Sequence, residues 1–194
     1  MAKKRRGYSG FANAVETAAM VVSLLFLMEM VDWILMVLYQ SPVSRLDGLG
    51  ILPRTPRGLI GIVFSPMLHV NLAHFLANAV PLFVLLVLLF WDRHYHPELT
   101  LIMIWIASGL GTWLIGRGDT IHIGASSLIY GLVTYLIASG FLMKTWRSAF
   151  VAIGVFILYG GIFYGVLPQT GPISWEGHLS GAIAGIWAAL RNHD

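Results

Sequence analysis

Six long apolar stretches run through a chain of only 194 residues, and they constrain its fold more than any other feature. They lie at residues 18–39, 71–90, 98–115, 126–143, 148–167 and 175–190, bounded by proline, glycine and charged residues. Only 11% of the chain is charged, against roughly 25% in a soluble domain, and a soluble domain of this size could not bury so much apolar sequence. Because about 20 apolar residues cross a bilayer as a helix, we expect an all-α membrane protein with a single bundle of six transmembrane helices.

The distribution of lysine and arginine predicts the orientation of this bundle. Six spans bring both termini to one side, together with the larger basic group: Lys3, Lys4, Arg5, Arg6, Arg93, Lys144, Arg147 and Arg191. The other side receives Arg45, Arg54, Arg57 and Arg117. Since positive charge concentrates on the cytoplasmic side, we expect cytoplasmic N- and C-termini, with a basic segment at residues 1–17 followed by a membrane domain at residues 18–194. No organelle-targeting segment is recognised, which favours a bacterial inner membrane.

Composition also excludes several classes of function. The chain contains no cysteine, so thiol catalysis, thiolate metal sites and disulfides are excluded. The net charge of +3 derives largely from residues 3–6, which we interpret as a topology signal and not as a nucleic-acid surface. No HExxH motif occurs, and we expect neither a metal nor an organic cofactor. The lipid bilayer is the predicted environment, and nucleic acid is not a predicted partner.

Polar residues within the second, fourth and sixth spans are the candidates for function. Asn78, Ser126 and His178 each lie 13 to 18 residues before the charged residue that ends their span on the cytoplasmic side. At ~1.5 Å of rise per residue, all three lie roughly 20 to 27 Å above that boundary. This depth is just below the outer surface of a ~30 Å hydrocarbon core. A polar side chain is costly there unless it is satisfied, so a shared depth indicates one buried site.

The chemistry of these residues predicts a nucleophile and its base. A serine hydroxyl attacks only when a base takes its proton, and a neutral imidazole suits that role, so Ser126 and His178 form a candidate dyad without an orienting acid. The start of a helix at Ser126 offers free amide donors for an oxyanion. His74 and Asn78 are four residues apart and share a helical face, from which both can donate hydrogen bonds toward one point. The same pair could instead only satisfy the polar groups of the preceding loop.

Small residues predict close packing beside this dyad. Gly181 and Gly185 share a helical face with His178 and form a small-xxx-small pair, which lets another backbone approach closely. Tyr130 lies one turn beyond Ser126, where its ring can rest against the imidazole and limit its rotamers.

Three motifs together resemble the rhomboid family of intramembrane serine proteases. They are HFLAN at residues 74–78, GASSLIYG at 124–131 and GHLSGAIAG at 177–185, on the second, fourth and sixth spans. By this resemblance Ser126 matches the nucleophile, His178 the base, and His74 and Asn78 the oxyanion-side donors, while Gly124 and Tyr130 match positions that line the site. Ser127 stands where the family commonly has glycine.

The resemblance implies an endopeptidase that cleaves transmembrane segments of other membrane proteins near the outer leaflet. It also implies that the fifth span and the loop at residues 168–174 move to admit substrate, and we expect water to reach the site past Gln169, Thr170 and Glu176. Two alternatives remain open. One is a catalytically inactive rhomboid-like protein that binds membrane clients, and the other is a proton-coupled transporter in which Glu29 and Asp32 carry protons.

Overall fold

A computed structural model describes residues 10–40 and 46–193, and every regular element within these ranges is a helix. The α-helices are α1 (Phe11–Leu38), α2 (Gly58–Phe64), α3 (Leu72–Trp91), α4 (Pro97–Ile115), α5 (Ser126–Leu142), α6 (Trp146–Tyr159) and α7 (Trp175–His193). Short 3-10 segments extend them: η1 (Asp47–Leu49), η2 (Ser65–Met67), η3 (Arg93–Tyr95) and η4 (Gly160–Val166). The all-helical prediction is confirmed, and each of the six expected stretches contains a helix. The basic residues 3–6 and Arg45, used to predict orientation, lie outside the described residues.

Four helical segments are long and apolar enough to cross a membrane: Phe11–Leu38, Leu72–Trp91, Arg93–Ile115 and Trp146–Val166. The other two expected spans differ for physical reasons. α5 is apolar but has only 17 residues, and α7 contains the buried polar residues Glu176 and Ser180. α5 is surrounded by protein, since it contacts α3, α4, α6 and α7, so it needs no long surface that faces lipid, whereas α7 leaves Ile183, Ile186 and Trp187 exposed. The described helices therefore fit an integral membrane protein.

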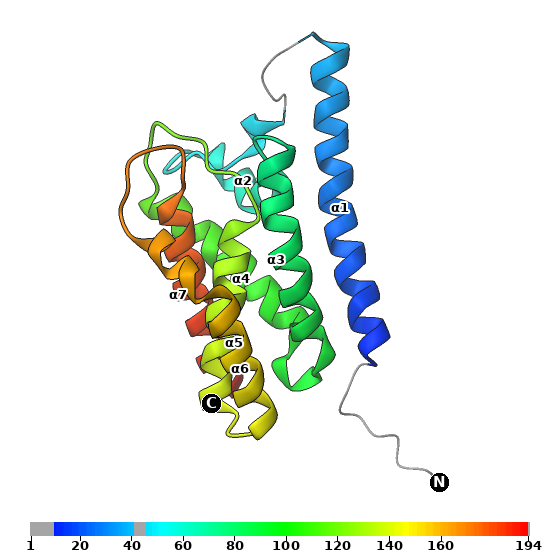
Figure 1. Cartoon of the computed structure of the whole chain (residues 1–194). Helices are drawn as coiled ribbons and strands as arrows, with labels where there is room; N and C mark the ends of the chain where they lie inside the picture. Colours follow the sequence, from blue (N-terminus) through cyan, green and yellow to red (C-terminus); the bar gives the residue numbers. More distant parts are fainter. Residues whose placement is uncertain (1–9, 41–45, 194) are drawn as a thin grey trace.

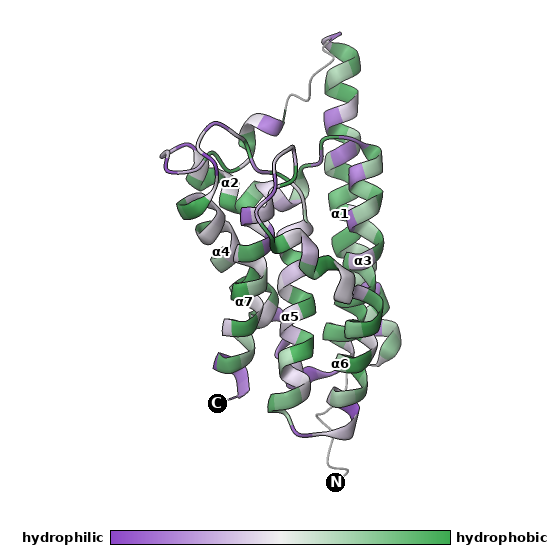
Figure 2. Ribbon diagram, turned by 60° about the vertical axis from the view of Figure 1, so that its left-hand side comes forward, coloured by the Kyte–Doolittle hydropathy of each residue, from purple (hydrophilic) through white to green (hydrophobic). Residues whose placement is uncertain are grey.

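The bundle is organised around α5. α5 packs most extensively on α7, and α7 in turn packs on α4, while α6 covers another side of α5. α1 lies along α3 at the edge of the bundle, as Figure 1 shows. In the same view the first turn of α1 and the last turn of α7 lie toward one end of the molecule. The outer helices are mostly hydrophobic along their length, whereas the hydrophilic residues gather in the loops (Figure 2).

Two helix boundaries differ from the sequence prediction. α1 begins at Phe11, seven residues before the predicted start of the first span, so the helix includes part of the segment assigned to the cytoplasm. The predicted fifth span, residues 148–167, is not one α-helix, because α6 ends at Tyr159 and continues as the 3-10 segment η4. Gly160, Gly161 and Gly165 lie in η4, and glycine weakens an α-helix by about 1 kcal/mol relative to alanine.

The loops between helices are tied together at one end of the bundle. Ile51 and His122 form an isolated antiparallel bridge, with main-chain N–H to O=C distances of 3.0 and 2.9 Å. The indole of Trp113 donates to the Thr55 carbonyl at 2.8 Å. Arg54 reaches back to the carbonyls of the residues that end α4, donating to Leu114 and Gly116. These bonds fix the segment that leads into α5.

Candidate active site

Ser126 is the first residue of α5, and the turn before it is held from several directions. Gly124 has a φ of +112°, a conformation that glycine adopts without strain, and its N–H donates to the Ser65 carbonyl at 2.8 Å. A side chain at position 124 would come within 2.9 Å of the His74 ring, so glycine also leaves room for that imidazole. The turn therefore presents Ser126 at the open end of α5, where the first amides of the helix have no carbonyl of a preceding turn to bind.

His178 lies in the first turn of α7, and its Nε2 is 3.0 Å from the Ser126 Oγ. The contact exists because α5 and α7 pack with their backbones close together. A Cβ atom added to Gly181 would overlap the backbone of Ser127, and one added to Gly185 would overlap the carbonyl of Gly131. The predicted small-residue face thus lies against α5.

The imidazole of His178 is held on its other edge by a main-chain carbonyl. Its Nδ1 lies 3.0 Å from the Gly165 oxygen in η4. Because a carbonyl only accepts hydrogen bonds, we assign the proton to Nδ1, which leaves the Nε2 lone pair facing the hydroxyl of Ser126. Tyr130 stacks on the same ring, with centroids 4.1 Å apart and planes within 9°. The imidazole is thus fixed in rotation and in tautomer without a carboxylate partner.

His74 and Asn78 lie on the side of this site formed by α3. The ring of His74 lies beside Gly124 and contacts the ring of His69, at 5.2 Å between centroids. The Asn78 side chain is buried, and its amide nitrogen donates to the His74 carbonyl at 2.8 Å. This bond within the helix uses one of the two amide hydrogens, so the second remains available to another acceptor. His69 precedes α3, and its Nε2 accepts a long 3.4 Å bond from the Ala125 N–H.

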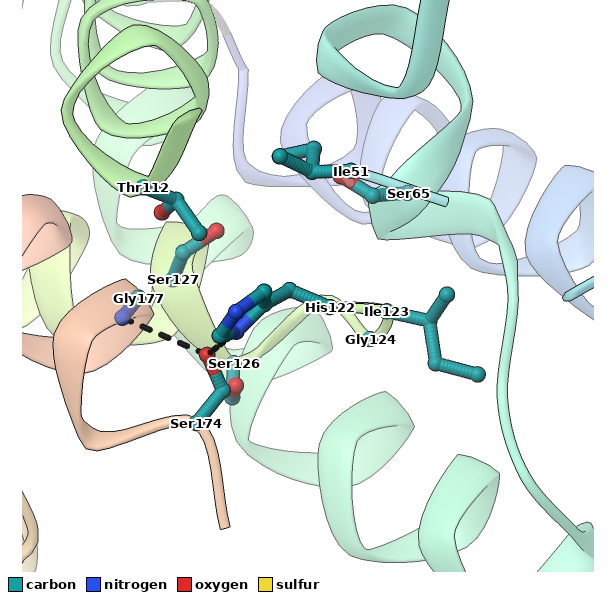
Figure 3. A pocket seen from close by; sticks show the side chains of 10 residues that line it. All are labelled: Ile51, Ser65, Thr112, His122, Ile123, Gly124, Ser126, Ser127, Ser174 and Gly177. Atoms are coloured by element: carbon teal, nitrogen blue, oxygen red, sulfur yellow. Dashed lines mark hydrogen bonds between the residues drawn. The ribbon is translucent and has the colours of Figure 1, made fainter. Parts of the chain in front are cut away.

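A small cavity adjoins Ser126. It has a volume of about 20 Å³ and is lined by residues of several loops and helices: Ile51, Ser65, Thr112, His122, Ile123, Gly124, Ser126, Ser127, Ser174 and Gly177. Figure 3 shows these residues around it. About 10–15 Å³ of such space holds one water molecule, so the cavity is large enough for a single water beside both serines.

An ion pair close to the site was not predicted from the sequence. The Arg117 Nε donates to Glu176 at 2.7 Å, and its other nitrogens donate to the carbonyls of Gly171 and Ile173 at 3.0 and 2.6 Å. The Glu176 side chain is 1% exposed. The expectation that Glu176 lines an open water route is therefore wrong, because its carboxylate is buried and binds Arg117. The sequence signal for this ion pair was Glu176 itself, a charged residue at the start of an apolar helix.

His122 and Ser174 form a second tie between the same loops. The Nδ1 of His122 lies 2.6 Å from the Ser174 Oγ, and that oxygen accepts from the Gly177 N–H at 3.3 Å, as drawn in Figure 3. The Nε2 of His122 lies 3.3 Å from the Arg117 carbonyl, so we assign the proton to Nε2 and the role of donor to the Ser174 hydroxyl. Burial lowers the pKa of His122 below its ordinary value, which keeps the ring neutral at neutral pH.

One acidic residue of α1, Asp32, makes a structural contact. The buried Asp32 accepts a hydrogen bond from the Leu46 N–H at 2.9 Å, which ties the segment after α1 to that helix. Glu29 and Asp32 border a recess with Asp47 and His69 that is too small to hold a water molecule. Within residues 10–40 and 46–193, no group of three His, Cys, Asp or Glu side chains is arranged to hold a metal ion.

Comparison with known proteins gives one clear family. The sequence profile of the Rhomboid domain matches residues 56–193. Uncharacterized proteins of Mycobacterium bovis and Mycobacterium tuberculosis are each 42% identical over 176 residues, which cover 87% of this chain and 70% of the relative. A protein of Acanthamoeba polyphaga mimivirus that is named as a rhomboid protein is 28% identical over 159 residues, covering 78% of this chain and 82% of its own. No solved structure matches the chain.

Proposed function

The chain belongs to the rhomboid family, and on this premise we propose that it is an intramembrane serine endopeptidase with Ser126 as nucleophile and His178 as base. The observation that carries the proposal is the 3.0 Å contact between the Ser126 hydroxyl and the unprotonated Nε2 of His178. The bond from Nδ1 to the Gly165 carbonyl supports it, because it leaves Nε2 able to accept a proton.

The reaction follows from this geometry. As the Ser126 oxygen attacks the scissile carbonyl, its proton passes to Nε2 of His178, and the imidazolium then gives that proton to the nitrogen of the departing amine. An acyl ester on Ser126 remains. His178 next takes a proton from water, the resulting hydroxide attacks the ester, and the returned proton releases the serine and a new carboxyl group. The cavity beside Ser126 is a candidate place for that water.

Charge that develops on the carbonyl oxygen requires donors on the side opposite the base. The first amides of α5, at Ser126 and Ser127, point in the direction of the helix N-terminus, where they favour negative charge. We assign the His74 ring and the second amide hydrogen of Asn78 as further donors, and Gly124 as the residue that keeps this side open. No metal or organic cofactor enters the reaction.

The proposed substrates are transmembrane segments of other membrane proteins. The backbone amides and carbonyls of a helix are already paired, so a substrate must unwind locally before its carbonyl reaches Ser126. Segments with glycine, proline or polar residues near the outer leaflet are therefore favoured. This assignment retains six spans with cytoplasmic termini, a basic segment at residues 1–17 before the membrane domain at 18–194, and a place in the bacterial cytoplasmic membrane.

A serine-directed fluorophosphonate tests the proposal, with the two adjacent serines as matched variants. The wild-type protein in detergent should react with the probe. Ser126→Ala should lose the label, and its cleavage of a model transmembrane substrate should fall by more than about 10³-fold. Ser127→Ala should keep the label. Labelling that survives in Ser126→Ala and disappears in Ser127→Ala would show that the other hydroxyl attacks. A folded wild-type protein that neither reacts nor cleaves would contradict the protease assignment and leave the client-binding and transporter alternatives.

A further inference from the structure

The group that orients His178 is a backbone atom in a helical segment with few buried side chains. Gly165 belongs to η4, in which no residue is buried, and η4 follows α6, in which only Ser148, Ala152 and Val155 are buried. A 3-10 helix has poorer hydrogen-bond geometry than an α-helix, and seven residues is long for one. The orientation of the imidazole therefore depends on a segment that few buried contacts hold in place.

The identity of residue 165 is also constrained by the site. A Cβ atom at this position would overlap the hydroxyl of Tyr130 and lie 3.2 Å from the Nδ1 of His178. Only glycine lets the main chain approach closely enough for its carbonyl to bind the imidazole. The neighbouring Gly161 is different, because a Cβ atom there would have no neighbour within 4 Å.

The carbonyl distinguishes the two neutral tautomers of the ring. With the proton on Nδ1, the ring donates to Gly165 and offers a lone pair to Ser126. With the proton on Nε2, the Nδ1 lone pair would face the carbonyl oxygen, and the ring could no longer accept the proton of Ser126. The hydrogen bond to Gly165 thus selects the tautomer that can act as a base.

We propose that Gly165 is a positioning residue whose carbonyl holds His178 in the base-competent tautomer, so that the dyad is active only while η4 is docked on α7. The inference rests on the proposed function for its consequence in catalysis, but the tautomer itself is a property of the folded protein. When η4 is displaced, Nδ1 loses its acceptor, and His178 is no longer held ready to take the proton of Ser126.

The test compares Gly165→Ala with Gly161→Ala, because the two glycines belong to the same segment. Loss of tautomer control in a Ser-His-Asp triad lowers kcat about 10⁴-fold, and a neutral carbonyl holds a ring less strongly than a carboxylate, so Gly165→Ala should lower kcat by about 10- to 10³-fold with KM changed little. Gly161→Ala should stay within about twofold of wild type, since nothing contacts the added methyl group. In the Tyr130→Phe background, where the overlapping hydroxyl is absent, the loss caused by Gly165→Ala should be several-fold smaller.

Nitrogen NMR of ¹⁵N-histidine protein in alkaline buffer supplies a readout that does not depend on activity. The His178 signals, assigned by their absence in His178→Asn, should show a protonated Nδ1 and an unprotonated Nε2 in wild type, and a mixture of tautomers in Gly165→Ala. A proton on Nε2 in wild type would overturn the inference even if Gly165→Ala failed to fold. So would a folded Gly165→Ala protein that keeps both the wild-type tautomer and the wild-type kcat.

The two proposals can fail separately. If wild type has the Nδ1 proton but reacts with no fluorophosphonate, the protease assignment fails and the positioning of the ring by Gly165 stands. If wild type reacts and Gly165→Ala changes neither tautomer nor rate, the protease assignment stands and the role of Gly165 is excluded.

Discussion

The proposed dyad lies between two parts of the molecule that are packed very differently. α5 and α7 bury ten of 17 and nine of 19 residues, respectively, whereas α6 buries three of 14 and η4 buries none. Both regions contain several glycines. In α7, Gly181 and Gly185 face backbone atoms of α5, while Gly154 and Gly161 in the α6–η4 region face open space.

This difference separates two requirements of the proposed dyad. The distance between Ser126 and His178 has to be constant, and it is set by two helices whose backbones are in contact through small residues. The orientation of His178 depends on Gly165, from the region with few buried contacts. Gly181 and Gly185 thus allow two helices to pack closely, whereas the α6–η4 region touches the proposed site mainly through Gly165.

The largest expected effect comes from placing one methyl group in each region. Gly181→Ala forces the added carbon into the backbone of Ser127, and relief of that overlap should cost about 2–3 kcal/mol and separate Ser126 from His178. Gly154→Ala adds the same carbon to an open part of α6 and should stabilise the protein by about 0.5–1 kcal/mol through helix propensity. Thermal unfolding in detergent measures both. Destabilisation of equal size at the two positions would contradict the contrast between the regions.

A second prediction concerns the boundary between the two regions. Arg117 binds Glu176 at the start of α7 and the carbonyls of Gly171 and Ile173 in the loop that follows η4, so it marks where the firmly held structure begins. Glu176→Gln keeps the shape but removes the charge partner of Arg117. Removal of one member of a fully buried pair costs about 3–5 kcal/mol, and because the Arg117 side chain is 32% exposed and can turn to water, we expect about 1–2 kcal/mol.

The control for this variant is Glu16→Gln, which changes the net charge identically at an exposed position of α1 outside its first turn. It should leave the unfolding temperature nearly unchanged. Proteolysis within residues 167–174 should become faster in Glu176→Gln alone, because the loop has lost its attachment to α7. Unchanged cleavage and stability would mean that other contacts hold this boundary.

The sequence predicted the helices well because helices follow from the hydrophobic pattern. The rhomboid family was recognised from three motifs, and the family match confirms it. The predicted contact between Ser126 and His178 is present at 3.0 Å, and so is the stack of Tyr130 on the imidazole. The catalytic roles of these residues remain predictions, to be decided by the fluorophosphonate experiment.

What the sequence did not reveal are contacts made by backbone atoms and by loops. The sequence pattern cannot indicate the role of the Gly165 carbonyl. Every residue has a main-chain carbonyl, and only the fold decides where it points. The Arg117–Glu176 and His122–Ser174 contacts join residues more than 50 positions apart, from two loops and the first turn of α7, and helical periodicity cannot predict such contacts. The change from α-helix to 3-10 helix between α6 and η4 was indicated only by the density of glycines in the predicted fifth span.

The smallest expected effect is a dependence of stability on pH that arises from His122. Burial outweighs the nearby carboxylates and lowers the pKa of this ring from its ordinary 6.5. The unfolded chain therefore binds a proton before the folded protein does, and stability is lost as pH falls below about 6.5, until the folded ring is also protonated. His122→Gln removes this titration and keeps a side chain that can bind Ser174. As pH is lowered from 7.5 to 5, the unfolding temperature of this variant should rise relative to that of wild type. The two proteins are compared at intervals of about half a pH unit. A constant difference across that range would show that protonation of His122 does not weaken the tie between the loops of the firmly held region.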